Sequence, residues 1–326
     1  MKQKIHIDIN GVPSICRASL RECPRGGAQN HYSSMQEAEV YADFFNELES
    51  KLLHNRKETF DEEKAKERSK IIEEAMRNPL MERFKTKNFY FDSSLQEWDE
   101  EREKQHEEII NSLLENYKDV PCEGKVVFSA GLPGAGKTTV LKSIENLDID
   151  DYATINSDDI KEMMVQKGMV PEIRGFTPLE CANLIHEESS YLADILQNKL
   201  ASERKNVIFD MTCKNKKSVQ RRMDVFKNQG YREEDMTMVF VDIEIETSKK
   251  RALNRYKEGL NDYFSGKSNL GGRYVPDSVF KACQPTWSNT SSINQEVFRT
   301  FQLDGNSRMK MIEYDNNGRE PRKLDK

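Results

Sequence analysis

Short apolar runs alternate with helix-type patterns along the C-terminal two-thirds of this chain. Each run spans five to seven residues and is bounded by polar residues or glycine, which is typical of a buried strand. The segments between them carry apolar residues at helical spacing, most clearly over 178–200, where Thr177 to Glu180 forms a capping box with proline at the first helical position. This alternation predicts an α/β fold with a mainly parallel sheet flanked by helices. The predicted strands are 125–130, 152–156, 206–210, 237–243 and 309–314.

The N-terminal residues have a different pattern. Alternation over Ile5–Ile9, followed by Asn10-Gly11, predicts a strand and a type I′ turn, and Val12–Cys16 is expected to return as a second strand. A helix is expected from Ser33 onward. Its apolar positions lie at helical spacing: Ala38, Tyr41, Phe44, Phe45 and Leu48.

Charged residues dominate the next segment. Lys, Arg, Glu and Gln fill most positions of 51–70 and 97–108, and apolar residues are sparse, which predicts long exposed helices. A turn-forming segment at 121–124 then separates them from the first buried strand. We therefore predict three parts: a small turn-rich unit with one helix at 1–50, a charged helical region at 51–120, and the α/β domain at 121–326.

Composition limits the function classes. The chain is 33% charged with a net charge of −6, so it has no overall attraction to nucleic acid or to an anionic membrane. No apolar run reaches the roughly 18 residues that a membrane span needs, and the first residues lack the apolar core of a secretory signal. The expected location is cytoplasmic, with no membrane contact.

The six cysteines form no C-x-x-C pair. Cys16, Cys23 and His31 are residues of metal-binding type, but their spacing is poor for a metal site and no fourth ligand is evident from the sequence. Ordinary reduced thiols are therefore the expectation.

The strongest chemical signal is the segment GLPGAGKTT, which directly follows the first predicted strand. Its spacing G-x-x-x-x-G-K-[ST] is that of the phosphate-binding P-loop. Backbone N–H groups of such a loop surround a polyphosphate, Lys137 reaches the β- and γ-phosphates, and the Thr138 hydroxyl binds Mg²⁺. The sequence therefore predicts ATP and Mg²⁺ as cofactors. The expected nucleotide-binding residues are Gly131, Pro133, Gly134, Ala135, Gly136, Lys137, Thr138 and Thr139.

An acidic residue follows the second predicted strand. Asp158 lies 21 residues beyond Lys137, within Asn156-Ser-Asp-Asp159. A carboxylate at the end of a strand beside the P-loop faces the γ-phosphate, where a kinase needs a base for the acceptor hydroxyl. The same residues also suit a helix N-cap, and both roles are compatible.

Two further groups extend this constellation. Asp210 ends an apolar strand, as in a Walker B strand, and Thr212 lies just beyond it. Arg251 and Arg255 share one face of a predicted helix, and Arg273 follows a glycine-containing loop. Phosphoryl transfer needs cations around the transferring oxygens, and arginines on a mobile segment supply them.

Together these residues resemble the zeta-toxin family of P-loop kinases over about residues 122–316. The resemblance implies a P-loop kinase-type sheet. Its motifs are the P-loop GLPGAGKTT, Asn156-Ser-Asp158, Arg255-Tyr256, Gly-Arg273-x-Val-Pro276 and the late strand end Tyr314-Asp315-Asn316.

The resemblance also implies roles for single residues. In that family the acid matching Asp158 is the general base, and the arginines matching Arg255 and Arg273 flank the ATP phosphates. Asp194 and Asp210 stand where the family typically has glutamate, and they are expected to shape the acceptor site. Family members phosphorylate the 3′-hydroxyl of UDP-N-acetylglucosamine, some relatives phosphorylate NAD, and a small helical antitoxin restrains them. The resemblance therefore implies a kinase with a small nucleotide-type acceptor and, as a partner, an antitoxin.

Three alternatives stay open. The segment from Asn156 to Lys161, with Asp210-x-Thr212, also resembles the 5′-polynucleotide kinases, although the acidic charge balance disfavours nucleic acid. A nucleotide-gated regulatory module without transfer would need the P-loop but no acceptor base. The helices within 33–118 carry a further hypothesis: they would restrain the kinase in cis, in place of a separate antitoxin, or they would form a targeting or partner-docking domain.

Overall fold

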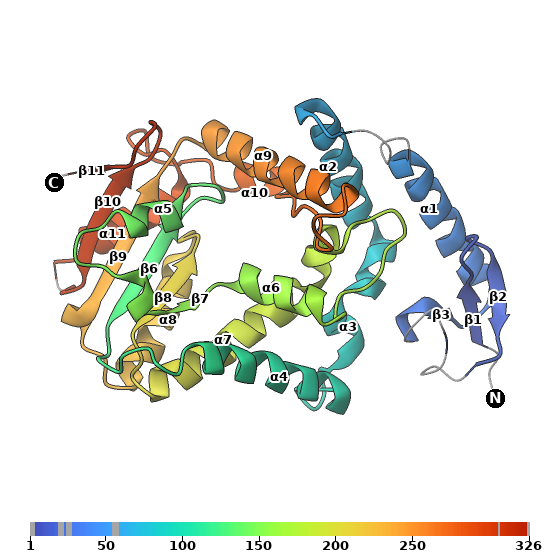
Figure 1. Ribbon diagram of the computed structural model, residues 1–326, viewed down its shortest axis with the longest axis horizontal. Helices are drawn as coiled ribbons and strands as arrows, with labels where there is room; N and C mark the ends of the chain where they lie inside the picture. Colours follow the sequence, from blue (N-terminus) through green and yellow to red (C-terminus); the bar gives the residue numbers. More distant parts are fainter. Residues whose placement is uncertain (1–3, 19–22, 24–27, 54–58, 306, 325–326) are drawn as a thin grey trace. The chain divides into compact units, whose positions relative to one another are not determined.

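The structure is a computed structural model that describes residues 4–18, 23, 28–53, 59–305 and 307–324 (Figure 1). The chain forms two compact units, each assembled from segments that are far apart in the sequence. Unit 1 comprises Met1–Arg102, Met164–Glu188 and Tyr256–Tyr274, and unit 2 comprises Glu103–Met163, Ser189–Arg255 and Val275–Lys326. The domain boundaries predicted at residues 50 and 120 stay predictions.

Unit 2 contains a six-stranded sheet with the order β11-β10-β9-β6-β8-β7. The neighbouring strands β10, β9, β6, β8 and β7 all pair in parallel, and only β11 is antiparallel to its neighbour. The predicted α/β fold is confirmed, and each predicted strand is present with its ends shifted by one residue. The strands are β6 (Val126–Gly131), β7 (Ala153–Ile155), β8 (Val207–Met211), β9 (Met236–Asp242), β10 (Lys310–Asp315) and β11 (Arg322–Leu324).

Helices cover both faces of this sheet because its strands are apolar on both sides. Val127 of β6 belongs to a buried cluster with Val140 and Leu141 of α5 (Lys137–Lys142) and Ala252 of α9 (Ile245–Phe264). The next residue, Phe128, points to the opposite face and packs edge-on against Phe226 of α8, with ring centroids 6.0 Å apart. The other elements that contribute to unit 2 are α4 (Glu100–Asn116), η3 (Ile149–Asp151), α6 (Ser157–Gln166), α7 (His186–Ser202), α8 (Lys216–Asn228), η5 (Glu233–Asp235), α10 (Asp277–Lys281) and α11 (Ile293–Gln302).

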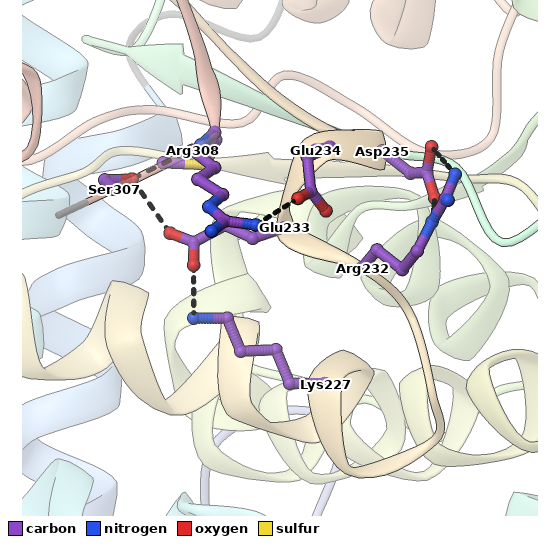
Figure 2. Close-up of polar contacts among 8 residues, drawn as sticks. Lys227, Arg232, Glu233, Glu234, Asp235, Ser307 and Arg308 are labelled. Carbon is purple, nitrogen blue, oxygen red and sulfur yellow. Dashed lines mark hydrogen bonds and ion pairs between the residues drawn. The ribbon is translucent and has the colours of Figure 1, made fainter.

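Charge pairs fix the amino-terminal edge of this sheet, where η5 leads into β9 (Figure 2). Glu233 accepts from Lys227 Nζ at 3.1 Å and from Ser307 Oγ at 2.8 Å. Arg308 donates to Glu234 at 2.8 Å, and both side chains are well exposed. Because parallel strands place their carboxyl ends at the opposite edge, this cluster is remote from the P-loop and offers control positions for mutagenesis.

Unit 1 begins with a three-stranded sheet of order β2-β1-β3. It contains β1 (Lys4–Ile7), β2 (Pro13–Cys16) and β3 (His31–Tyr32). The predicted type I′ turn is wrong: Ile7 pairs with Pro13, so five residues connect the strands. The Asp8 side chain closes this loop by accepting hydrogen bonds from the backbone N–H groups of Asn10 and Val12, which a two-residue turn would not allow.

The remaining elements of unit 1 are helices and a two-stranded antiparallel sheet. The predicted helix over 178–200 begins as the 3₁₀ helix η4 and continues as α7, and the capping box at its start is confirmed. The elements are η1 (Ala28–Asn30), α1 (Met35–Leu53), α2 (Glu62–Met76), η2 (Pro79–Phe84), α3 (Thr86–Tyr90), β4 (Phe91–Asp92), β5 (Glu97–Trp98) and η4 (Pro178–Ile185).

Buried ion pairs anchor the charged N-terminal helices. Arg68 of α2 donates two hydrogen bonds of 2.7 Å to Glu180, and both side chains are fully buried. Arg102 makes the same kind of pair with Glu188, at 2.6 and 2.9 Å. The expectation of exposed helices is therefore incomplete, because two arginines of the charged segment are buried and form ion pairs with glutamates within residues 164–188.

Candidate active site

The P-loop connects β6 to α5 and depends on glycine at its last position. Gly136 has a φ of 81°, and a Cβ atom there would lie 2.5 Å from the side-chain nitrogen of Asn316. That nitrogen donates to the Ala135 carbonyl at 2.6 Å, and Ser248 Oγ donates to the Pro133 carbonyl at 2.5 Å. Asn316 and Ser248 thus fix the loop from outside.

Lys137 lies in the first turn of α5 and folds back over the loop. Its Nζ donates to the Gly131 carbonyl at 3.3 Å and lies 3.4 Å from Oδ1 of Asp210. Asp210 reaches this position because β8 pairs with β6 in parallel, so both strands end at the same edge. The predicted phosphate-binding lysine and the predicted Walker B acid therefore meet at the mouth of the loop.

The charge of Asp210 is set by opposing effects. Burial raises the pKa of its carboxyl, whereas the positive charges of Lys137 and Arg255 lower it. Arg255 lies on α9 and is exposed, and its charge also lowers the pKa of Glu162 against the effect of that residue's burial. Arg255 is therefore close enough to act electrostatically on carboxylates at this edge of the sheet.

Residues for a magnesium ion are present at the same place. The Thr138 side chain is exposed in the first turn of α5, next to Lys137, and Asp210 offers a carboxylate beside that lysine. Hydroxyl and carboxylate oxygens are the donors that Mg²⁺ prefers, together with phosphate oxygens and water. The donor set therefore fits the predicted cofactor.

Asp158 is the second residue of α6, which begins shortly after β7. Its backbone N–H donates to Asn156 Oδ1 at 2.9 Å, so Asn156 caps the helix. Lys161 Nζ lies 3.3 Å from the Asp158 carboxylate. Burial lowers the pKa of Lys161 to about 8, which marks a largely buried cation beside the predicted base.

Asp159 faces the same edge, and the sequence had not assigned it a role. Although the residue is exposed by its solvent-accessible surface, partial burial of its carboxyl raises the pKa of Asp159 to about 6, and the neighbouring carboxylates of Glu162 and Asp210 act in the same direction. Asn156 Nδ2 donates to its Oδ1 at 3.1 Å. The only sequence signal for Asp159 is its place as the second acid of the pair that follows β7.

A small pocket of about 70 Å³ opens beside Asp210. This volume accommodates one functional group rather than a whole nucleotide, for which pockets of about 300 Å³ or more are typical. Its lining combines the ends of β7 and β8 with one face of α7. The lining residues are Ile155, Ser157, Ser190, Ala193, Phe209, Asp210 and Arg222.

Arg222 of α8 is the residue of this pocket that the sequence did not reveal. It forms an ion pair with Asp194 and donates to Gln197 Oε1 at 2.8 Å. Its guanidinium also lies over the Phe209 ring, 4.9 Å from the centroid. Burial lowers its pKa, although Asp194 acts in the opposite direction. Asp194 is thus bonded to Arg222, and Arg222 lines the pocket.

The structure places the other predicted residues less centrally. Thr212 is exposed beyond β8, and its carbonyl accepts from Asn294 at 2.6 Å. Arg251 donates to the Asn316 carbonyl at 2.9 Å and so supports the residue that fixes the P-loop. Arg273 belongs to unit 1, where burial lowers its pKa to about 10. Unit 2 thus brings together Lys137, Asp210 and their neighbours, and a role for Arg273 at the phosphates stays a prediction.

Within the described residues, no helix is long and apolar enough to cross a membrane.

Known proteins are similar to this chain in sequence pattern and in fold. A family model described as "Zeta toxin" matches residues 110–315. A comparison with curated proteins finds no match.

Solved structures share the fold. The AvrRxo1-ORF1:AvrRxo1-ORF2 complex with sulphate ions contains a chain that is 20% identical, with a TM-score of 0.50, over 70% of this chain and 67% of that chain. The complex with ATP gives 18% identity and a TM-score of 0.51 over 79% and 70%. A chain from the PezAT chromosomal toxin-antitoxin system of the human pathogen Streptococcus pneumoniae gives 16% identity and a TM-score of 0.43 over 66% and 80%.

Proposed function

The chain belongs to the zeta toxin family, and from this premise we propose that it is an ATP-dependent kinase that transfers the γ-phosphate to a hydroxyl of a small nucleotide-type molecule. The observation that carries the proposal is the meeting of Lys137 and Asp210 at the mouth of the P-loop, 3.4 Å apart. A regulatory nucleotide switch needs the loop but has no use for further carboxylates at the adjacent strand end, where Asp158 and Asp159 lie.

The proposed reaction assigns a task to each residue. Loop N–H groups and Lys137 bind the triphosphate, and Thr138 and Asp210 hold Mg²⁺, which neutralises phosphate charge when bound. Asp158 accepts the proton of the acceptor hydroxyl. The hydroxyl oxygen forms a bond to the γ-phosphorus, and the bond between the γ-phosphorus and the oxygen of ADP breaks. Arg255 and, as the family resemblance implies, Arg273 stabilise the charge on the transferring oxygens.

For the acceptor, we favour the 3′-hydroxyl of UDP-N-acetylglucosamine. Family membership supports this choice, and the pocket beside Asp210 offers hydrogen-bonding groups for one polar substituent of such a molecule. Asp194 is assigned to this site as the residue that holds Arg222, and Thr212 as a residue at its rim. NAD and a 5′-hydroxyl oligonucleotide are the alternative acceptors.

An antitoxin is the proposed protein partner. A solved structure that shares the fold is described as an AvrRxo1-ORF1:AvrRxo1-ORF2 complex, which supports a partner protein. Restraint in cis by residues 33–118 is less favoured, because Arg68 and Arg102 bind to Glu180 and Glu188 from residues 164–188. These buried ion pairs are part of the fold of unit 1, whereas a detachable restraint would not share them.

Transfer of labelled γ-phosphate tests the proposal. Purified full-length protein is incubated with ATP, Mg²⁺ and each acceptor in turn: UDP-N-acetylglucosamine, NAD and a 5′-hydroxyl oligonucleotide. Asp158→Asn should abolish the label while keeping ATP affinity. Asp224→Asn, the same substitution at an exposed position of α8, is the matched control.

Each result has a distinct meaning. Label on the sugar nucleotide that depends on Asp158 supports the proposal in full. Label on NAD or on the oligonucleotide retains the kinase and replaces the acceptor. The nucleotide-gated module would be favoured if the wild type binds ATP without transfer to any acceptor and Asp158→Asn behaves in the same way.

A further inference from the structure

Four side chains of metal-binding type converge in unit 1. The donor atoms of His6, Cys16, Cys23 and His31 all lie within 4.8 Å of one another. His6 Nδ1 is 3.2 Å from Cys23 Sγ, and His31 Nε2 is 3.3 Å from Cys16 Sγ. His6 is the fourth donor that the sequence did not make evident, because it precedes the first cysteine by ten residues.

Strand register explains why these residues meet. His6 of β1 pairs directly with His31 of β3, so both side chains project from the same face of the sheet. Cys16 pairs with Lys4, two residues from His6, and therefore projects from that face as well. Cys23 comes from the connection between β2 and β3.

The opposite face of the same sheet is apolar. Ile5 and Tyr32, which alternate with the histidines, form a buried cluster with Ala38 of α1. The small sheet therefore has one face that packs on a helix and one face that gathers imidazoles and thiols. Three strands of two to four residues bury little apolar area, and units of this size commonly need a metal or a disulfide for stability.

The donor spacing suits a tetrahedral ion. Zinc bonds of about 2.3 Å to sulfur and about 2.0 Å to nitrogen place tetrahedral donors roughly 3.3–3.8 Å apart. The contacts of 3.2 and 3.3 Å lie at or just below the short end of this range, and all donor atoms lie within 4.8 Å of one another. Neither Cys16 nor Cys23 forms a disulfide. Cys23 and His31 are buried, and His6 and Cys16 are half-buried.

Other cysteines are poor competitors for a metal. Cys181 and Cys213 are buried, and burial raises the pKa of the Cys213 thiol to about 12. A metal binds the thiolate, so a thiol held in its protonated form by an apolar environment is a weak ligand. Cys122 is exposed and lies outside the cluster.

We propose that His6, Cys16, Cys23 and His31 form a structural zinc site that joins the three N-terminal strands and the β2–β3 connection. A tetrahedral set of two sulfur and two nitrogen donors is characteristic of zinc, and a fully protein-bound ion is structural rather than catalytic. The site is independent of the proposed kinase chemistry, and its test reads metal rather than phosphate transfer.

Metal analysis of the purified full-length protein tests the site. The wild-type protein should contain about one zinc ion per chain. Cys16→Ser and Cys23→Ser should lose it, and Cys122→Ser, a matched change at an exposed cysteine, should keep it. Binding of Co²⁺ to the metal-free protein should produce the visible absorption of a tetrahedral thiolate complex.

A second measurement uses only the wild-type protein, so the test does not depend on whether the cysteine variants fold. Mass spectrometry after brief alkylation should show Cys16 and Cys23 protected until a chelator is added, and Cys122 modified throughout. The site is refuted if reduced, folded wild-type protein takes up neither Zn²⁺ nor Co²⁺, if the chelator leaves the alkylation of Cys16 and Cys23 unchanged, or if the native protein carries a Cys16–Cys23 disulfide without metal.

Discussion

The ammonium of Lys137 lies 3.4 Å from the carboxylate of Asp210, at the edge of the sheet where β6 and β8 both end. Each charge compensates the other while no triphosphate is bound. When ATP enters with Mg²⁺, the lysine is expected to turn to the phosphates and the carboxylate to the metal. Through this pair, the binding of Mg²⁺ is expected to depend on the binding of ATP.

Asp210→Asn tests this coupling. The amide keeps the shape of the side chain but removes the charge that supports Mg²⁺, so we expect kcat to fall by about 10²–10³-fold. ATP affinity measured without Mg²⁺ should be equal or higher, because a negative charge near the triphosphate is lost. Calorimetry with and without Mg²⁺ provides the comparison, and Glu234→Gln at the remote edge is the control (Figure 2). Equal loss of ATP binding under both conditions would contradict this role.

Arg222 and Asp194 should act on the acceptor rather than on ATP. Arg222 lines the pocket beside Asp210, and Asp194 holds it. We expect Arg222→Gln to raise the KM of the acceptor by about tenfold or more, which corresponds to about 1.4 kcal/mol, and to leave the KM of ATP unchanged. Arg232→Gln, which removes an arginine paired with Asp235 at the remote edge, is the control (Figure 2).

The double variant separates positioning from direct contact. If Asp194 acts through Arg222, adding Asp194→Asn to Arg222→Gln should cost little further activity. Full additivity of the two losses, or a change confined to ATP, would show that the pair does not position the acceptor.

The sequence predicted the sheet and the P-loop because both are local patterns. Apolar runs of five to seven residues mark buried strands, and the spacing of Gly131 to Thr138 requires no tertiary information. Arg222 and Asp159 were missed because their roles depend on which strand ends lie side by side. His6 was missed for the same reason: a register between β1 and β3 brings it to His31, 25 residues further along the chain.

Arg68→Met should destabilise the protein strongly. The change leaves Glu180 as a fully buried charge without its bidentate partner, although Tyr256 still donates to it at 2.6 Å. Loss of one member of a buried pair typically costs about 3–5 kcal/mol. Urea denaturation provides the measurement, and Lys51→Met, which breaks an exposed pair with Glu47, should change the stability far less. Similar small losses for both variants would contradict the anchoring role of Arg68.

The elevated pKa of Asp159 predicts a pH dependence of stability. Its pKa is about 6 in the folded chain, against an ordinary value of 3.8 for an aspartate in an unfolded chain, so the folded state binds more protons between these limits. Stability from this residue is therefore highest at the acidic end and falls as the pH rises from about 4 to 6. Because the side chain is partly exposed, the effect should be about 1 kcal/mol or less.

Urea midpoints of the wild-type protein and Asp159→Asn measure this effect. The stability of the wild type relative to the variant should decline from about pH 4.5 to about pH 7. Only the wild type acquires a partly buried charge at Asp159, and that charge is also repelled by Glu162 and Asp210. Asp224→Asn should show no such trend relative to the wild type. A wild-type advantage that grows with pH would mean that Asp159 is stabilised in its charged form, and its carboxylate would then be a better candidate for a metal ligand or a base than Asp158.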